Sequence, residues 1–102
     1  MIRVALMYPR TEESHFNMDY YLEHHMPLLA GLLGDNLDRY EVDEGIGGAA
    51  PGDPPPYAVI CYLYFANTDA LRALGKSGPE VMTDLPNFTN VQPQIQISRI
   101  IE

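Results

Sequence analysis

The sequence predicts an α+β domain built in the order β-α-β-β-α-β. Large apolar residues recur at every second position near both ends of the chain, and one central run is apolar throughout, as in strands. Between these runs, apolar residues recur at helical spacing and follow residues that commonly cap helices. The 102 residues suit a single domain, residues 1–102, and a hydrophobic content of 46% is enough for one core.

The first strand is expected over residues 2–8, where apolar side chains alternate until Pro9. A helix should then run from the N-cap Asn17 to Leu33, because Gly34 is suited to end it. At about 100° per residue, one stripe of this helix faces the sheet. The stripe contains Met18, Tyr21, His25, Leu28, Leu29 and Leu32.

A polar strand is expected over residues 37–44, near an edge of the sheet. Residues 45–56 hold four glycines and four prolines and predict a connecting loop. Residues 57–65 are apolar on both faces, which fits a central strand covered on both sides. Because the helices can cover only one face of this sheet, we expect a second copy of the chain to cover the other, in a homodimer.

The second helix is expected to be short. Asn67 or Thr68 caps it, it ends near Gly75, and Pro79 could open a further turn. The last strand is expected over residues 94–101. The resulting order is the split βαβ arrangement of a ferredoxin-like fold with an antiparallel sheet.

Charge argues against two kinds of partner. Fourteen acidic and six basic residues give a net charge of −8, and no basic stripe offsets it, so neither nucleic acid nor an anionic membrane surface is expected to bind. No apolar run reaches the roughly 20 residues that cross a bilayer. The N-terminus does not resemble a signal peptide, so a cytoplasmic location is expected. The lone Cys61 lies in an apolar run and is expected to be buried and unreactive.

Two segments resemble the EthD family, which is named from ethyl tert-butyl ether degradation. Residues 16–28, FNMDYYLEHHMPL, combine an aromatic helix start, paired aromatics and His-x-Pro, and residues 84–89, DLPNFT, provide a second match. Asn17 stands where the family commonly has an acidic residue. The resemblance implies a dimeric α+β barrel with a ligand cavity between helices and sheet. It also implies that His25 is the functional position.

His25 lies in the middle of the sheet-facing stripe and has two interpretations. As a core residue, it would hydrogen-bond to a tyrosine or a carbonyl group. As a catalytic residue, it would transfer protons, because an imidazole titrates near neutral pH. Pro27 favours the second interpretation, since it disrupts the helix beside His25. Tyr21, one turn earlier, is the expected second catalytic residue.

Four further residues are expected to bind substrate. Tyr62 and Tyr64 should approach His25 from the central strand. Asp84 and Phe88 come from the second matched segment, with Asp84 at the rim of the pocket. The alternative for this pair is structural: Asp84 would cap a turn and Phe88 would anchor it in the core.

No metal and no cofactor are expected. His24 and His25 point about 100° apart on a helix, so they cannot readily bind one ion, and His24 should be a surface residue. The chain has no cysteine pair and no dinucleotide-binding glycine motif. Haem, which related barrels handle, is a weaker alternative.

The sequence therefore predicts a protein that binds a small apolar or aromatic organic molecule. Cofactor-independent acid–base chemistry through His25, in catabolic or polyketide-type metabolism, is the leading hypothesis. The alternative is a non-catalytic accessory protein that binds a metabolite and supports an oxygenase system.

Overall fold

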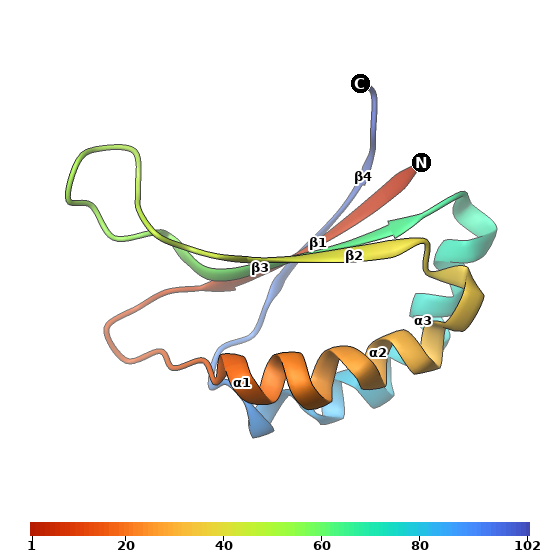
Figure 1. Ribbon diagram of the computed structural model, residues 1–102, viewed down its shortest axis with the longest axis horizontal. Helices are drawn as coiled ribbons and strands as arrows, with labels where there is room; N and C mark the ends of the chain where they lie inside the picture. Colours follow the sequence, from red (N-terminus) through yellow and green to blue (C-terminus); the bar gives the residue numbers. More distant parts are fainter.

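Four antiparallel strands form one sheet in the order β2-β3-β1-β4 (Figure 1). The computed structural model describes residues 1–102. The strands are β1 (Ile2–Pro9), β2 (Arg39–Glu44), β3 (Tyr57–Phe65) and β4 (Gln94–Arg99). The order confirms the predicted α+β ferredoxin-like fold, with the apolar run at the centre of the sheet and the polar strand at an edge.

Helices cover one face of the sheet (Figure 1). The first helical stretch joins α1 (Met18–Tyr20), a π-helical turn (Tyr21–His25) and α2 (Met26–Leu33). The second is α3 (Thr68–Thr83). Short 3₁₀ turns follow α2 and α3, at Gly34–Asn36 and Leu85–Asn87. None of the helices has the length and apolar character needed to cross a bilayer.

The first helical stretch begins as the sequence predicts, with the side chain of Asn17 accepting a hydrogen bond from the backbone N–H of Tyr20. Within it, the N–H of Met26 bonds to the carbonyl of Tyr21, which is the i→i+5 spacing of a π turn. Pro27 follows directly and has no N–H to offer the preceding turn. The regular α-helical hydrogen bonding is therefore interrupted beside Pro27, as the sequence predicts.

The π turn changes which side chains face the sheet. Its extra residue shifts every later position around the helix axis by about one residue. The buried positions after the turn are Met26, Leu29 and Leu33, whereas Leu28 is exposed and Leu32 only half-buried. The expected stripe is thus correct at Tyr21, His25 and Leu29 and wrong at Leu28.

Helix α3 is longer than predicted and runs through Gly75 and Pro79 without a break. Packing of its apolar face against the core outweighs the low helix propensity of glycine. The carbonyl that Pro79 leaves without a donor belongs to Gly75, which is exposed and can bond to water. Asn67 is the N-cap, and its side chain accepts from the N–H of Ala70.

The core lies between the helices and the sheet face that carries Val4, Val59, Leu63 and Phe65. Cys61 belongs to this core, and its burial raises the thiol pKa to about 11. The loop between β2 and β3 extends away from this body at one end of the molecule (Figure 1). Its first residue, Gly45, donates its N–H to the carbonyl of Ala58 and closes the hairpin.

Candidate functional site

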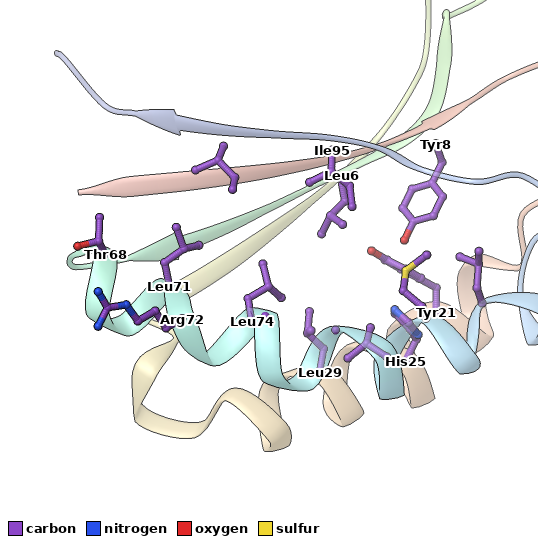
Figure 2. A pocket seen from close by; sticks show the side chains of 16 residues that line it. Leu6, Tyr8, Tyr21, His25, Leu29, Thr68, Leu71, Arg72, Leu74 and Ile95 are labelled. Atoms are coloured by element: carbon purple, nitrogen blue, oxygen red, sulfur yellow. The ribbon is translucent and has the colours of Figure 1, made fainter.

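A cavity of about 540 Å³ lies between α3 and the side chains of β1 and β4 (Figure 2). Eleven of its sixteen lining residues are hydrophobic. This volume falls within the roughly 300–1,000 Å³ of pockets that hold small organic ligands. Three polar side chains gather at one end of the cavity, and they are Tyr8, Tyr21 and His25 (Figure 2).

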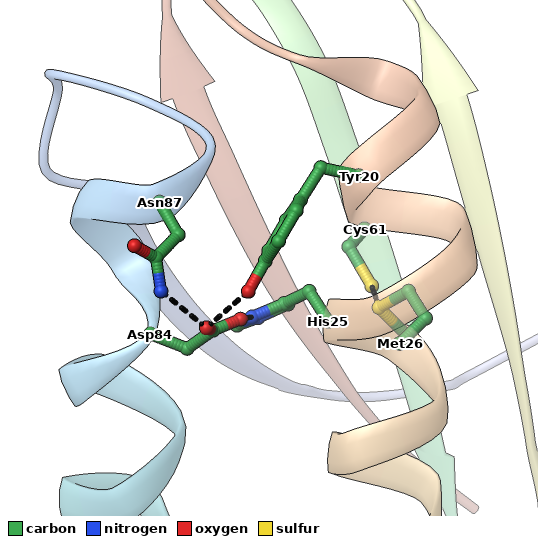
Figure 3. Close-up of polar contacts among 6 residues, drawn as sticks. All are labelled: Tyr20, His25, Met26, Cys61, Asp84 and Asn87. Carbon is green, nitrogen blue, oxygen red and sulfur yellow. Dashed lines mark hydrogen bonds and ion pairs between the residues drawn. The ribbon is translucent and has the colours of Figure 1, made fainter.

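His25 is the last residue of the π turn and bonds to Asp84, the residue that ends α3. The Nδ1 atom of His25 lies 3.0 Å from Oδ2 of Asp84. The other carboxylate oxygen accepts two hydrogen bonds, from the hydroxyl of Tyr20 at 2.7 Å and from Nδ2 of Asn87 at 2.8 Å (Figure 3). Four side chains from two helical segments thus form one network.

The network fixes the charge of Asp84. Partial burial opposes ionisation, but the hydrogen bonds from Asn87, Tyr20 and His25 outweigh it and lower the pKa of the carboxyl group. Asp84 is therefore a carboxylate at neutral pH, and a carboxylate can only accept hydrogen bonds. Nδ1 of His25 must be the donor in the contact between them.

This arrangement sets the tautomer of neutral His25. With the proton on Nδ1, the lone pair is on Nε2. The His25 side chain is 97% buried, with 3% exposed, and it lines the cavity. No protein group hydrogen-bonds to Nε2, which is not closed off from solvent. The site therefore presents a basic nitrogen, held from behind by Asp84, to an apolar space.

Two buried tyrosines lie beside this nitrogen. The ring of Tyr21 stacks on the imidazole of His25, with 5.1 Å between ring centroids and 18° between planes. Tyr8 projects from β1, and its hydroxyl points into the cavity towards the helix layer (Figure 2). Burial raises the pKa of both phenols well above the usual range, so both stay protonated and able to donate hydrogen bonds.

Sequence and structure comparisons place the chain in a family. The EthD domain model matches residues 9–92, which include His25 and Asp84. The chain belongs to the EthD family. No curated protein matches it significantly in sequence.

One solved structure agrees with this assignment, and two more distant ones share the fold. An EthD-like protein from Ralstonia eutropha JMP134 is 33% identical, with a TM-score of 0.92 over 99% of this chain and 92% of that one. An EthD-family protein from Bacillus halodurans C-125 is 18% identical, with a TM-score of 0.67 over 99% of both chains. A dimeric protein of unknown function with a ferredoxin-like fold from Bacteroides fragilis NCTC 9343 is 12% identical, with a TM-score of 0.53, over 97% of this chain and 94% of that one.

In this EthD-family chain, the six predicted site residues separate into three groups. His25 and Tyr21 line the cavity. Asp84 and Phe88 lie behind His25 and do not line it: Asp84 holds Nδ1, and the Phe88 ring centroid is 4.5 Å from that of the imidazole. The arrangement therefore does not support direct contact between a ligand and Asp84 or Phe88.

The expectation that Tyr62 and Tyr64 approach His25 is wrong. Successive side chains of a strand point to opposite faces, and these two share the face of β3 that the helices do not cover. There, Arg39 packs over the ring of Tyr64 at 3.9 Å, and the hydroxyl of Tyr64 donates to Glu41. The residues of this strand that face the helices are Val59, Cys61, Leu63 and Phe65.

Sequence reasoning missed three members of the EthD site. Tyr20 does not belong to the predicted sheet-facing stripe, yet its long side chain reaches Asp84. Asn87 lies in the second matched segment, three residues after Asp84, and was not singled out. Tyr8 lies in the alternating run of the first strand and was not singled out, although the alternation puts it on the same face as Val4 and Leu6.

No group of three or more His, Cys, Asp or Glu side chains is arranged to hold a metal ion. The exposed His24 stacks against Tyr20, with 4.9 Å between ring centroids, and does not join His25. The residues of the cavity can thus accept a proton at one atom, donate hydrogen bonds from two phenols and enclose an apolar molecule.

Proposed function

We propose that this EthD-family protein binds a small, apolar or aromatic organic molecule in the cavity under α3 and acts on it by cofactor-independent proton transfer through His25. The single observation that carries the proposal is the partnerless Nε2 of a His25 that Asp84 holds from behind, at one end of an apolar cavity. General bases in enzymes are commonly histidines held in this way by a carboxylate.

The proposed step begins with an acidic C–H or O–H group of the ligand beside Nε2 of His25. The nitrogen takes the proton, the electron pair of the broken bond stays on the ligand, and Asp84 stabilises the resulting imidazolium. Tyr8 and Tyr21 donate hydrogen bonds to the oxygen on which negative charge accumulates. Nε2 then returns the proton to the rearranged ligand. Cyclisations and dehydrations in catabolic or polyketide-type metabolism begin with such a proton abstraction.

The experiment that tests this proposal is a thermal-shift screen of uncharged aromatic and polyketide-like molecules, followed by product analysis for each compound that stabilises the protein. A ligand that binds the native state raises its apparent stability. For a compound that is turned over, His25→Ala should abolish turnover and leave the fold intact. His24→Ala is the matched control, because this neighbouring histidine is exposed and outside the cavity.

Equal turnover by wild type and His25→Ala would remove His25 from the reaction. Binding without any turnover would assign the accessory role, in which the protein holds a metabolite for an oxygenase system. No stabilisation by any compound in the screen would contradict a ligand cavity altogether.

We also propose that the protein is a homodimer, formed through the sheet face that no helix covers. Apolar side chains on this face include Ala5, Met7 and Ile60. The similar Bacteroides fragilis protein is dimeric. Light scattering at micromolar concentration should give about twice the chain mass of 11.4 kDa, and a monomer mass would contradict the proposal. The cytoplasmic location stays a prediction.

A further inference from the structure

Two glycines occupy the centre of the α3 face that lines the cavity. Leu71, Gly75, Gly78 and Met82 follow one another at helical spacing of three or four residues, and all four line the cavity. Neither Gly75 nor Gly78 has a side chain that could extend over the cavity. The helix backbone forms the cavity wall there.

The space in front of these glycines is open. A Cβ atom built at Gly75 or at Gly78 meets no atom within 4 Å. The opposite wall includes Ile95 and Ile97 of β4, whose side chains point to the helix side of the sheet and remain 56% and 59% exposed. Bare backbone on one side and branched apolar side chains on the other form a slot.

The lining of this slot has no unpaired charge. Arg72 is its only cation, and the guanidinium is already 3.1 Å from the carboxylate of Asp69. No aspartate or glutamate lines the cavity. Burying an ionised ligand without a partner is costly, and a net charge of −8 further disfavours anions.

Polar groups meet the slot at one end, where His25 lines the cavity and the hydroxyl of Tyr8 points into it (Figure 2). Nε2 of His25 has no hydrogen-bond donor within the chain, so a ligand that enters the cavity can supply one. The missing donor fits an acidic hydroxyl on the ligand, such as a phenol or an enol.

We propose that Gly75 and Gly78 determine specificity, because they open a slot for a flat, uncharged ring system that carries one acidic hydroxyl directed at His25. This inference rests on the proposed function and names the ligand class of the same cavity. We infer a flat ligand from the two helix positions that have no side chain. We infer an uncharged ligand because the lining has no unpaired charge, and a hydroxyl group because Nε2 of His25 can accept a hydrogen bond.

The test uses 2-naphthol as the probe, since it is flat, uncharged at neutral pH and fluorescent. Its affinity is measured by fluorescence titration for wild type, Gly75→Leu and Gly78→Leu. Each leucine should fill the slot and weaken binding by about tenfold or more. Gly31→Leu is the matched control, because Gly31 lies on α2, is exposed, does not line the cavity and also has no atom near a built Cβ.

Circular dichroism verifies that each variant is folded. If a leucine variant unfolds, Gly75→Ala and Gly78→Ala replace it, and their smaller side chains should weaken binding less but in the same direction. Unchanged affinity for 2-naphthol in folded variants would contradict the proposed slot. So would tighter binding of 2-naphthoate, which has the same rings with a negative charge.

Adamantan-1-ol separates failure of this inference from failure of the proposed function, since it is apolar and hydroxylated but globular. The slot predicts that it binds more weakly than 2-naphthol. If adamantan-1-ol binds and 2-naphthol does not, the slot is wrong and the apolar cavity still binds ligands. If neither probe nor any screened compound binds, both proposals fail.

Discussion

The Nδ1 atom of His25 lies 3.0 Å from Oδ2 of Asp84, although 59 positions separate the two residues in the chain. The contact joins the π turn of the first helical stretch to the end of α3. It fixes where the proton of the neutral imidazole is, and so which nitrogen faces the cavity.

Asp84→Asn should remove a pH-dependent contribution to stability. The pKa of Asp84 is lower in the folded protein than in the unfolded chain, where it is about 3.9. The carboxylate therefore stabilises the fold above that value, and the contribution is lost as the pH falls through the folded pKa. Urea unfolding at neutral pH should show a loss of about 1–3 kcal/mol in the variant.

As the pH falls through the lowered pKa of folded Asp84, the unfolding free energies of wild type and Asp84→Asn should converge, because below that pKa the carboxyl group is protonated in both states of the wild type. A difference that stays constant from neutral to acidic pH would contradict an ionised Asp84 in the network.

Tyr20→Phe should cost about 0.5–1.5 kcal/mol in urea unfolding, because it removes one of the donors to the Asp84 carboxylate. Tyr40→Phe is the control, since the hydroxyl of Tyr40 makes no hydrogen bond within the chain and its side chain is 40% exposed. Equal effects of the two substitutions would show that the hydrogen bond from Tyr20 contributes nothing measurable.

Gly45→Ala should destabilise the hairpin between β2 and β3. A Cβ at this position would lie 2.1 Å from the carbonyl oxygen of Tyr57, so the backbone would have to move. The expected cost is about 1–3 kcal/mol by thermal or urea unfolding. Gly47→Ala, two residues later in the same loop, meets no atom within 4 Å and should change stability little. Comparable losses in both variants would refute the close packing at Gly45.

Cys61 should be inert to thiol reagents in the native protein. Burial raises its pKa to about 11, and its Sγ atom packs 3.9 Å from Sδ of Met26. At a pH of about 8, labelling by a disulfide reagent such as DTNB should be slow until urea unfolds the chain. Fast stoichiometric labelling of folded protein would show that this part of the core opens readily.

Much of the fold follows from local patterns in the sequence. Apolar patterns place all four strands to within a few residues, and Asn17 caps the first helical stretch as its chemistry indicates. The length of α3 could not be predicted in this way, because tertiary packing rather than propensity carries the helix past Gly75. The π turn could not be predicted either. It leaves Leu28 exposed, whereas the neighbouring Leu29 is buried.

The site was only partly predictable for a related reason. Periodicity places His25 towards the sheet, but its partner Asp84 comes from a distant segment, and only the fold brings the two together. The prediction for Tyr62 and Tyr64 was wrong because successive side chains of a strand point to opposite faces. With Cys61 facing the helices, Tyr62 and Tyr64 lie on the face of the sheet away from His25.

The most direct test of the central claim is long-range ¹H–¹⁵N NMR of the histidine rings at neutral pH, with and without 2-naphthol. Variants at His15 and His24 assign the signals. The account predicts that neutral His25 carries its proton on Nδ1 and that 2-naphthol shifts Nε2 of His25 while the His24 signals stay in place. Binding of 2-naphthol with both His25 nitrogens unchanged, or a proton on Nε2 in place of Nδ1, would contradict it.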